Sequence, residues 1–152
     1  MFAVVVVALA AGPLHAQCSV KWIINLPCDA VSSILADQIK NWTTEDCPGN
    51  SQKCLYALVS VRDNIFATHT TPVLRFVDDI EFVFRPAESD GCEFSGHSVS
   101  RSWYAVLDSG TNYRNMYNLM QGGGLSSTPG FSEFTSDRNC TQYSTAKQLM
   151  GL

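Results

Sequence analysis

Positive charge is scarce in this chain, and that scarcity limits what the protein can bind. Lysine and arginine together number 10 in 152 residues, against 14 acidic residues, so the formal net charge is −4. The pI is near 5.2, and the basic residues form no run. Proteins that bind nucleic acid or anionic membrane surfaces usually carry a basic patch. We therefore expect neither of these as the main partner.

Recognisable catalytic and metal-binding motifs are also missing. The sequence contains no G-x-S-x-G nucleophile elbow, no H-E-x-x-H zinc motif and no Cys-x-x-Cys pair. The three histidines do not form a set with metal-ligand spacing. The glycines at 122–124 follow a predicted helix instead of opening one, which is unlike a phosphate-binding loop. We therefore predict no cofactor and no bound metal.

Only one long apolar run occurs, close to the amino terminus. Residues 2–11 are apolar, and Gly12, Pro13 and Ala16 follow them, which is the plan of a secretory signal peptide. We predict that residues 1–16 are a signal peptide cleaved after Ala16. The run is shorter than the ~20 residues needed to cross a bilayer. We expect a secreted, extracellular protein with no membrane span after cleavage.

Cysteines and glycosylation acceptors fit an exported protein. An even number of cysteines in such a chain favours disulfides over a zinc site. Cys47 with Cys54 is the one pair local enough to predict, because turn residues separate the two. Asn41 and Asn139 begin Asn-x-Thr acceptors. The six cysteines are Cys18, Cys28, Cys47, Cys54, Cys92 and Cys140.

The apolar pattern predicts one α+β domain over residues 17–124. Helices are expected at 29–41 and 112–121, where apolar residues recur every three or four positions. The order β-α-β-β-β-β-α favours a single curved antiparallel sheet with both helices on one face, in two layers. Residues 125–152 are expected to form an irregular tail packed on the domain and held by Cys140. The expected strands are 19–26, 54–61, 65–70, 73–85 and 92–101.

An unusual group of acids lies inside the fourth of these strands. In the extended sequence Phe-Val-Asp-Asp-Ile-Glu-Phe at 76–82, Asp78 points with the phenylalanines, whereas Asp79 and Glu81 point to the other face. A carboxylate among aromatic rings needs a hydrogen-bonding or charged partner. We expect the planar guanidinium group of Arg101 or Arg114 to hold the Asp78 carboxylate in a bidentate ion pair.

Three sequence blocks resemble the family known as domain of unknown function 1499, which occurs in bacteria and plant plastids. They are F-V-D-D-x-E-F at 76–82, S-x-S-R at 98–101, and D-x-G-x-N with a following arginine at 108–114. The resemblance covers about residues 26–121 and implies a fold with a polar network, but no activity. This chain departs from the pattern at Asn115, where the family has arginine, and has two extra residues between Arg101 and Asp108. The cysteines and the tail look like additions in an exported version.

Three functions remain open. We prefer a non-catalytic binding or interaction module for a small apolar ligand or an extracellular protein. Its ligand would occupy a cavity lined by Phe76, Ile80, Phe82, Phe94, Trp103, Tyr113 and Tyr117, unless these residues simply fill the core. One alternative is a hydrolase-like enzyme that uses Asp78, Asp79 or Glu81 with Arg101, since paired carboxylates can act as acid and base. Another is a structural extracellular component.

The polar residues that could form a site also have a simpler structural use. Arginine pairs can tie the sheet to a helix, and Asp108 suits the start of the second helix as a cap. Asp79, Glu81 and Asp108 could offer oxygen ligands to calcium, but the spaced loop of a calcium site is missing. The complete set of candidate site residues is Asp78, Asp79, Glu81, Arg101, Asp108, Asn112 and Arg114.

Overall fold

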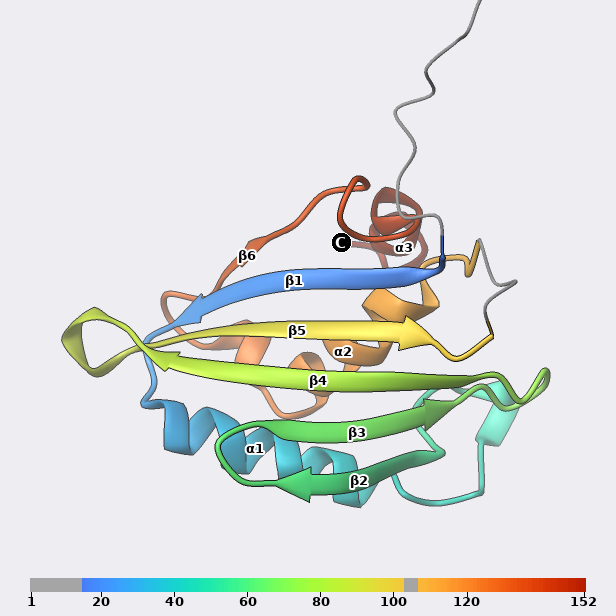
Figure 1. Ribbon diagram of the computed structural model, residues 1–152, viewed down its shortest axis with the longest axis horizontal. Helices are drawn as coiled ribbons and strands as arrows, with labels where there is room; N and C mark the ends of the chain where they lie inside the picture. The colour runs from blue at the N-terminus through green and yellow to red at the C-terminus, as the bar shows by residue number, and fades with distance from the viewer. Residues whose placement is uncertain (1–14, 103–106) are drawn as a thin grey trace, which may run out of the picture.

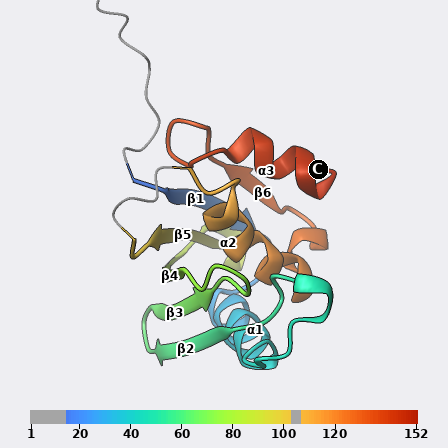
Figure 2. The same ribbon diagram turned by 90° about the vertical axis from the view of Figure 1, so that its right-hand side faces the viewer.

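The computed structural model describes residues 15–102 and 107–152, and these form an open antiparallel sheet with helices on one face (Figures 1 and 2). The strands lie in the order β2-β3-β4-β5-β1-β6. The predicted single antiparallel sheet of an α+β fold is therefore confirmed. The strands are β1 (Gln17–Ile24), β2 (Tyr56–Val61), β3 (Ile65–Thr70), β4 (Val77–Pro86), β5 (Cys92–Ser100) and β6 (Ser132–Phe134).

Three helices complete the described structure. Helix α1 (Cys28–Asn41) packs against β2, β3, β4 and β5, and α2 (Thr111–Gly122) packs against β1, β4 and β5. Both lie on the same face of the sheet, behind the strands in Figure 1. Helix α3 (Tyr143–Met150) packs against α2. Short 3-10 turns lie at Pro48–Asn50, Glu88–Asp90 and Leu125–Ser127.

Strict alternation along the central strands separates a buried face from an open one. Trp22, Phe82 and Phe94 are fully buried or nearly so, and they form the aromatic centre of the core. Met116 of α2 packs against β5 at Gly96, where an added Cβ would lie 2.6 Å from the Met116 sulfur. The contact explains why a residue without a side chain lies in the middle of this strand.

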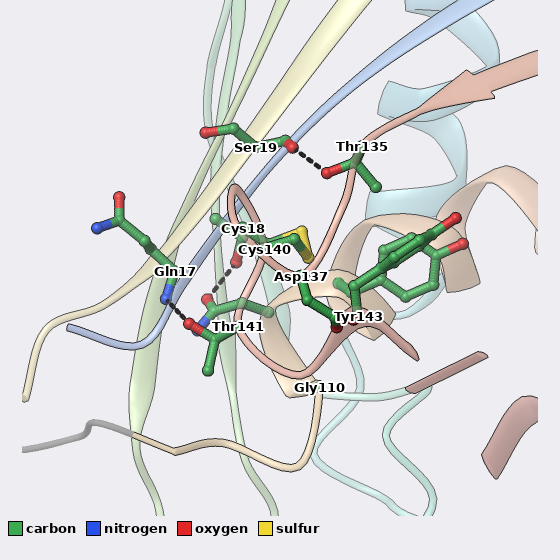
Figure 3. Close-up of a disulfide and its surroundings, with 12 residues drawn as sticks. Gln17, Cys18, Ser19, Gly110, Thr135, Asp137, Cys140, Thr141 and Tyr143 are labelled. Atoms are coloured by element: carbon green, nitrogen blue, oxygen red, sulfur yellow. Dashed lines mark hydrogen bonds between the residues drawn. A yellow bond between two sulfur atoms is a disulfide. The ribbon is translucent and has the colours of Figure 1, made fainter. Parts of the chain in front are cut away.

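The carboxy-terminal segment differs from the irregular tail expected from the sequence, because it contains β6 and α3. Strand β6 has three residues and α3 has eight, so neither is long enough to give a clear periodic pattern. Tertiary contacts hold the segment instead. The disulfide between Cys18 and Cys140 joins it to β1 (Figure 3). On either side of this bridge, a backbone hydrogen bond runs from Thr141 N to Gln17 O and another from Ser19 N to Asn139 O.

All six cysteines form disulfides: Cys18 with Cys140, Cys28 with Cys92, and Cys47 with Cys54. The predicted local bridge is therefore confirmed. The other two bridges connect residues 122 and 64 positions apart in the sequence. In the part of the chain that the structure describes, no helix is long and apolar enough to cross a membrane.

Candidate functional site

A pocket of about 330 Å³ lies at the end of the sheet where β4 begins and β5 ends. This volume falls at the lower end of the range for small-molecule sites. Its walls come from the loop before β2, the turn between β3 and β4, and the segment that leads into α2. The lining residues are Asn50, Gln52, Thr71, Val73, Leu74, Phe76, Asp78, Ser100, Leu107, Asp108, Ser109 and Thr111.

Exposed apolar side chains form the rim of this pocket. Leu74 and Leu107 are 70% and 73% exposed, and Val73 is exposed to a similar degree. Val73 and Leu74 were predicted to begin a strand, but β4 starts only at Val77. The turn forms because Thr71 accepts a hydrogen bond from the Phe76 amide, and Arg75 adopts a left-handed backbone with φ of 59°. The turn therefore presents two aliphatic side chains outward, beside a cavity.

The floor of the pocket is polar and centres on Asp78, whose exposed fraction is only 2%. Asn115 of α2 donates from Nδ2 to Asp78 Oδ2 at 2.7 Å, and from the same nitrogen to Ser98 Oγ at 3.2 Å. Ser98 in turn donates to Asn112 Oδ1, and Asn112 donates to Ser100 Oγ. A continuous network of hydrogen bonds therefore joins β4, β5 and α2 beneath the pocket.

The expected ion pair between Asp78 and an arginine is wrong. Arg101 instead holds Asp79, with both guanidinium contacts at 2.9 Å on the open face of the sheet. Strand alternation explains this outcome, since Ser100 is the register partner of Asp78 and the next residue, Arg101, points to the opposite face. The buried partner of Asp78 is the neutral side-chain amide of Asn115.

The pKa of the Asp78 carboxyl is raised above its usual range. Burial is the main cause, because it disfavours the charged form, and the negative charges of Asp108 and Asp79 add to the effect. Hydrogen bonds from Asn115 and Ser100 oppose the increase. Asp78 is thus a carboxyl group that neutral donors hold in a poorly solvated position.

Arg114 contributes positive charge to the same neighbourhood without pairing with Asp78. It makes no ion pair within 4 Å of any carboxylate among the described residues. Its charge acts on Tyr56, whose pKa is raised by burial and by Asp78 and is lowered by Arg114. The Tyr56 hydroxyl donates to the backbone oxygen of Asn115 at 2.7 Å.

His69 lies directly opposite Asp78 in the register of β3 and β4, and it is fully buried. Its Nε2 donates to the backbone oxygen of Gln52 at 2.9 Å, and its ring packs 4.5 Å from that of Tyr56. Burial lowers the pKa of His69 to about 4, although hydrogen bonds to the backbone oppose the change. His69 is therefore neutral at physiological pH.

Three buried side-chain atoms within residues 15–102 and 107–152 have no hydrogen-bond partner: Gln52 Oε1, His69 Nδ1 and Arg114 Nε. Buried polar atoms are normally satisfied by protein or ordered water. Gln52 lines the pocket, His69 bonds to its backbone, and Arg114 acts on the adjacent Tyr56. The unsatisfied atoms thus belong to the residues around Asp78.

The protein-family model for DUF1499, a protein family of unknown function, matches residues 29–122. This chain belongs to the DUF1499 family. No curated protein and no solved structure matches it. The family match encloses the entire pocket lining and Asn115, whereas β1, β6, α3 and Cys140 lie outside it. The pocket is therefore part of the DUF1499 region of the chain.

Several candidate residues in the DUF1499 region do not meet at the pocket. Asp79 and Glu81 lie on the open face of the sheet, away from Asp78. Glu81 accepts a hydrogen bond from Asn64 there, and Asp79 pairs with Arg101. The hydrolase hypothesis required these side chains to share one cleft with Asp78, so the arrangement gives it no support.

Asp108 and Asn112 do lie beside the pocket. Asp108 accepts hydrogen bonds from the backbone amides of Gly110 and Asn112 at the start of α2, which agrees with the predicted capping role. Asn112 also donates its side-chain amide to Asp108, at 2.8 Å. Both oxygens of Asp108 are therefore occupied by donors from its own segment.

Most of the predicted aromatic set fills the core instead of lining a cavity. Ile80, Phe82, Phe94, Tyr113 and Tyr117 are buried. Of the set, Phe76 lines the pocket, and Trp103 lies outside the described residues.

Sequence reasoning missed other lining residues for identifiable reasons. Asn50 and Gln52 belong to the loop closed by the predicted disulfide between Cys47 and Cys54, and nothing in their pattern pointed to β4. For Asn115, the one signal in the sequence was the family resemblance, which led us to expect an arginine at this position. The structure shows that Asn115 contacts the buried acid.

Proposed function

We propose that this protein is a non-catalytic extracellular binding module, and that it holds a small molecule with an apolar body in the pocket beside Asp78. The observation that carries the proposal is the combination of an apolar rim with a buried polar floor. Ligand sites typically combine mostly apolar walls with a few well-placed polar groups. Single exposed leucines are common on proteins, but here they surround one cavity.

The extracellular setting rests on chemistry that suits oxidising compartments. Three disulfides brace the domain, and such bonds persist outside the cytosol. The proposed signal peptide and the acceptors at Asn41 and Asn139 fit the same setting, and both asparagines are exposed. Because the bridge between Cys47 and Cys54 closes the loop that holds Asn50 and Gln52, it also restrains this part of the pocket wall without a ligand.

A binding role fits the polar groups better than catalysis does. The acids at the pocket are Asp78 and Asp108, and both oxygens of Asp108 already accept bonds from the start of α2. A pair of carboxylates in acid and base roles needs two groups free to exchange protons with substrate. Asp78 alone does not provide that pair.

The first experiment detects a ligand carried by the natural protein. Native mass spectrometry of material purified from its own source should show a mass above that of the polypeptide and its glycans, and denaturation should release the extra mass. A purely apo protein from the natural source would count against a retained ligand.

The second experiment tests the pocket with a simple probe, 1-hexanol, followed by amide resonances in nuclear magnetic resonance spectra. Hexanol should shift resonances of residues 71–78 and 107–111. Leu74→Ser should weaken binding about five- to tenfold, since part of a leucine's apolar contact is lost. Leu149→Ser is the matched control, because Leu149 is 63% exposed and lies away from the pocket. Equal effects of the two variants would contradict the proposed site.

A further inference from the structure

We infer that the pocket selects a cation, and that its preferred ligands are organic amines in which an ammonium group meets Asp78 and an apolar chain meets the rim. This inference rests on the proposed binding function and adds the chemical class of the ligand. It follows from three features of the pocket: the sign of its charges, the type of its unsatisfied polar atoms and the position of its apolar side chains.

The charged residues that line the pocket are all acidic. Asp78 and Asp108 are present, and the lining formed by the described residues contains no lysine, arginine or histidine. The groups that face Asp78 from neighbouring elements do not neutralise it by contact. His69 is neutral, Tyr56 keeps its proton, and Arg114 makes no ion pair with it. Asp79, next in sequence, is paired with Arg101 on the other face of the sheet.

A carboxylate in this position is costly to ionise, and a bound cation would remove that cost. Opposite charges close together in a poorly solvated site attract far more strongly than in water. An anionic ligand would meet two acids and add repulsion. A neutral ligand would gain contacts with the rim but no charge attraction. On charge alone, the pocket should therefore bind a cation more tightly than a neutral molecule, and a neutral molecule more tightly than an anion.

The hydrogen-bonding groups of the lining also favour a cationic ligand. Gln52 is one of the lining residues, and its buried Oε1 accepts no hydrogen bond. Asp78 accepts hydrogen bonds from Asn115 and Ser100, and an ionised carboxylate can accept further bonds at the same time. The floor thus offers acceptors and needs donors. An ammonium group brings three donors and no acceptor, so it matches this floor.

The exposed leucines at the rim favour a ligand that also carries an apolar chain. Leu74 and Leu107 stand exposed at the pocket, while Asp78 lies at its buried end. A linear molecule can therefore place its charged end on Asp78 and lay its chain against the leucines. The expected ligand is an amphipathic amine instead of an inorganic cation, since a bare ion would leave the rim uncovered.

The test compares three probes with the same six-carbon chain: hexylammonium, 1-hexanol and hexanoate. Dissociation constants are measured at neutral pH on the disulfide-bonded protein by nuclear magnetic resonance titration. We expect hexylammonium to bind at least about tenfold more tightly than hexanol, with hexanoate weakest. Acidification should reduce the advantage of hexylammonium, because protonation of Asp78 removes the attraction.

Two variants assign the preference to Asp78. Asp78→Asn should abolish the advantage of hexylammonium over hexanol. Asp79→Asn makes the same charge change at the next residue on the opposite face, and it should keep the advantage. Gln52→Leu removes the unpartnered acceptor from the surface loop, and it should reduce the advantage without altering the core.

The possible failures separate the two proposals. If hexanol and hexanoate bind as well as hexylammonium, the inference is overturned while the pocket stands as a binding site. If none of the probes perturbs the pocket, the proposed function itself fails. An equal loss of preference in Asp78→Asn and Asp79→Asn would show general attraction to an acidic protein, and it would overturn the assignment to this site.

Discussion

Two carboxylates, Asp78 and Glu133, lie in contact with the interior of this protein but are held in different ways. Glu133, in β6, accepts hydrogen bonds from Trp22 Nε1 at 2.9 Å, from the Tyr143 hydroxyl at 2.8 Å and from the Tyr113 hydroxyl. Asp78 accepts from the neutral Asn115 amide and from Ser100, and it lies beside a pocket. Glu133 thus accepts hydrogen bonds from three side chains of the protein, whereas Asp78 has fewer donors and borders the pocket.

This difference separates a structural acid from a candidate binding acid. Bonds to a charged acceptor are among the stronger ones in proteins, so Glu133 fastens the carboxy-terminal segment onto the aromatic residues of the core. The pKa values of Tyr113 and Tyr143 are raised, mainly by burial and further by Glu133, which keeps both hydroxyls protonated as donors. Asp78 lacks such a shell, and the missing donors are what a ligand could supply.

The two acids also differ in their relation to the family match. Asp78 lies within residues 29–122, whereas Glu133 and Cys140 lie beyond them. The pocket therefore belongs to the part of the chain shared with the family model. Glu133 itself belongs to the carboxy-terminal segment, which packs against β1 and α2. Glu133 and its donors Trp22, Tyr113 and Tyr143 are called the Glu133 cluster below.

The largest loss of stability is expected from removing the disulfide between Cys18 and Cys140, which holds the carboxy-terminal segment that contains Glu133. In the double variant Cys18→Ala and Cys140→Ala, the free energy of unfolding should fall by about 4 kcal/mol, because the bridge closes a long loop even when the bridge from Cys28 to Cys92 is intact. Guanidinium denaturation at neutral pH measures the loss. Hydrogen exchange should increase in residues 132–146 and change little in β4.

The control for this variant removes the short bridge instead. Replacing Cys47 and Cys54 with alanine should cost about 2.5 kcal/mol, since the loop they close is short. That variant should disturb the wall of the Asp78 pocket, through Asn50 and Gln52, and spare the Glu133 cluster. Faster exchange around Asp78 after loss of the long bridge would mean that the two regions do not behave independently.

A smaller loss is expected when Glu133 itself is changed. Glu133→Gln should lower the free energy of unfolding by about 2–3 kcal/mol, because an amide cannot accept from three donors as the carboxylate does. Chemical denaturation measures this value. Asp79→Asn provides the comparison, as its ion pair with Arg101 is exposed and should be worth less than about 1 kcal/mol. Similar losses in both variants would refute the structural role of Glu133.

The sequence was sufficient to predict five of the six strands, both longer helices and the local disulfide, because each leaves a local pattern of apolar or turn residues. Alternation also placed Asp78 in the interior and Asp79 outside, as observed. The same rule applied to Arg101 would have excluded it as the partner of Asp78, since Ser100 occupies the inward position.

The rest depended on contacts between distant residues. Strand β6 is too short to show alternation, and Glu133 is one acid in a polar segment until Trp22, Tyr113 and Tyr143 surround it. The pocket is likewise formed by residues that lie far apart in the sequence. Leu74 resembles a strand residue in the sequence, and only the turn that follows Pro72 places it at a rim.

The smallest change in stability, and the sharpest contrast with Glu133, is expected for Asp78→Asn. The ion pair expected from the sequence would leave an arginine unpaired in this variant, but the partner in the structure is the neutral amide of Asn115. At neutral pH the variant should melt at the same temperature as the wild type or higher, since it removes a buried charge and keeps an acceptor for Asn115.

The difference in stability between the wild type and Asp78→Asn should depend on pH in a defined direction. The pKa of Asp78 is raised in the folded state, so the folded protein retains a proton that the unfolded chain loses as the pH rises above about 4. Wild-type stability therefore falls, relative to the variant, as the pH increases, and the two melting curves converge near pH 4. His69 is present in both proteins, so its acid titration largely cancels in the difference. A variant that melts well below the wild type at pH 7 would show that Asp78 is held by its surroundings as firmly as Glu133, and the contrast between the two acids would be lost.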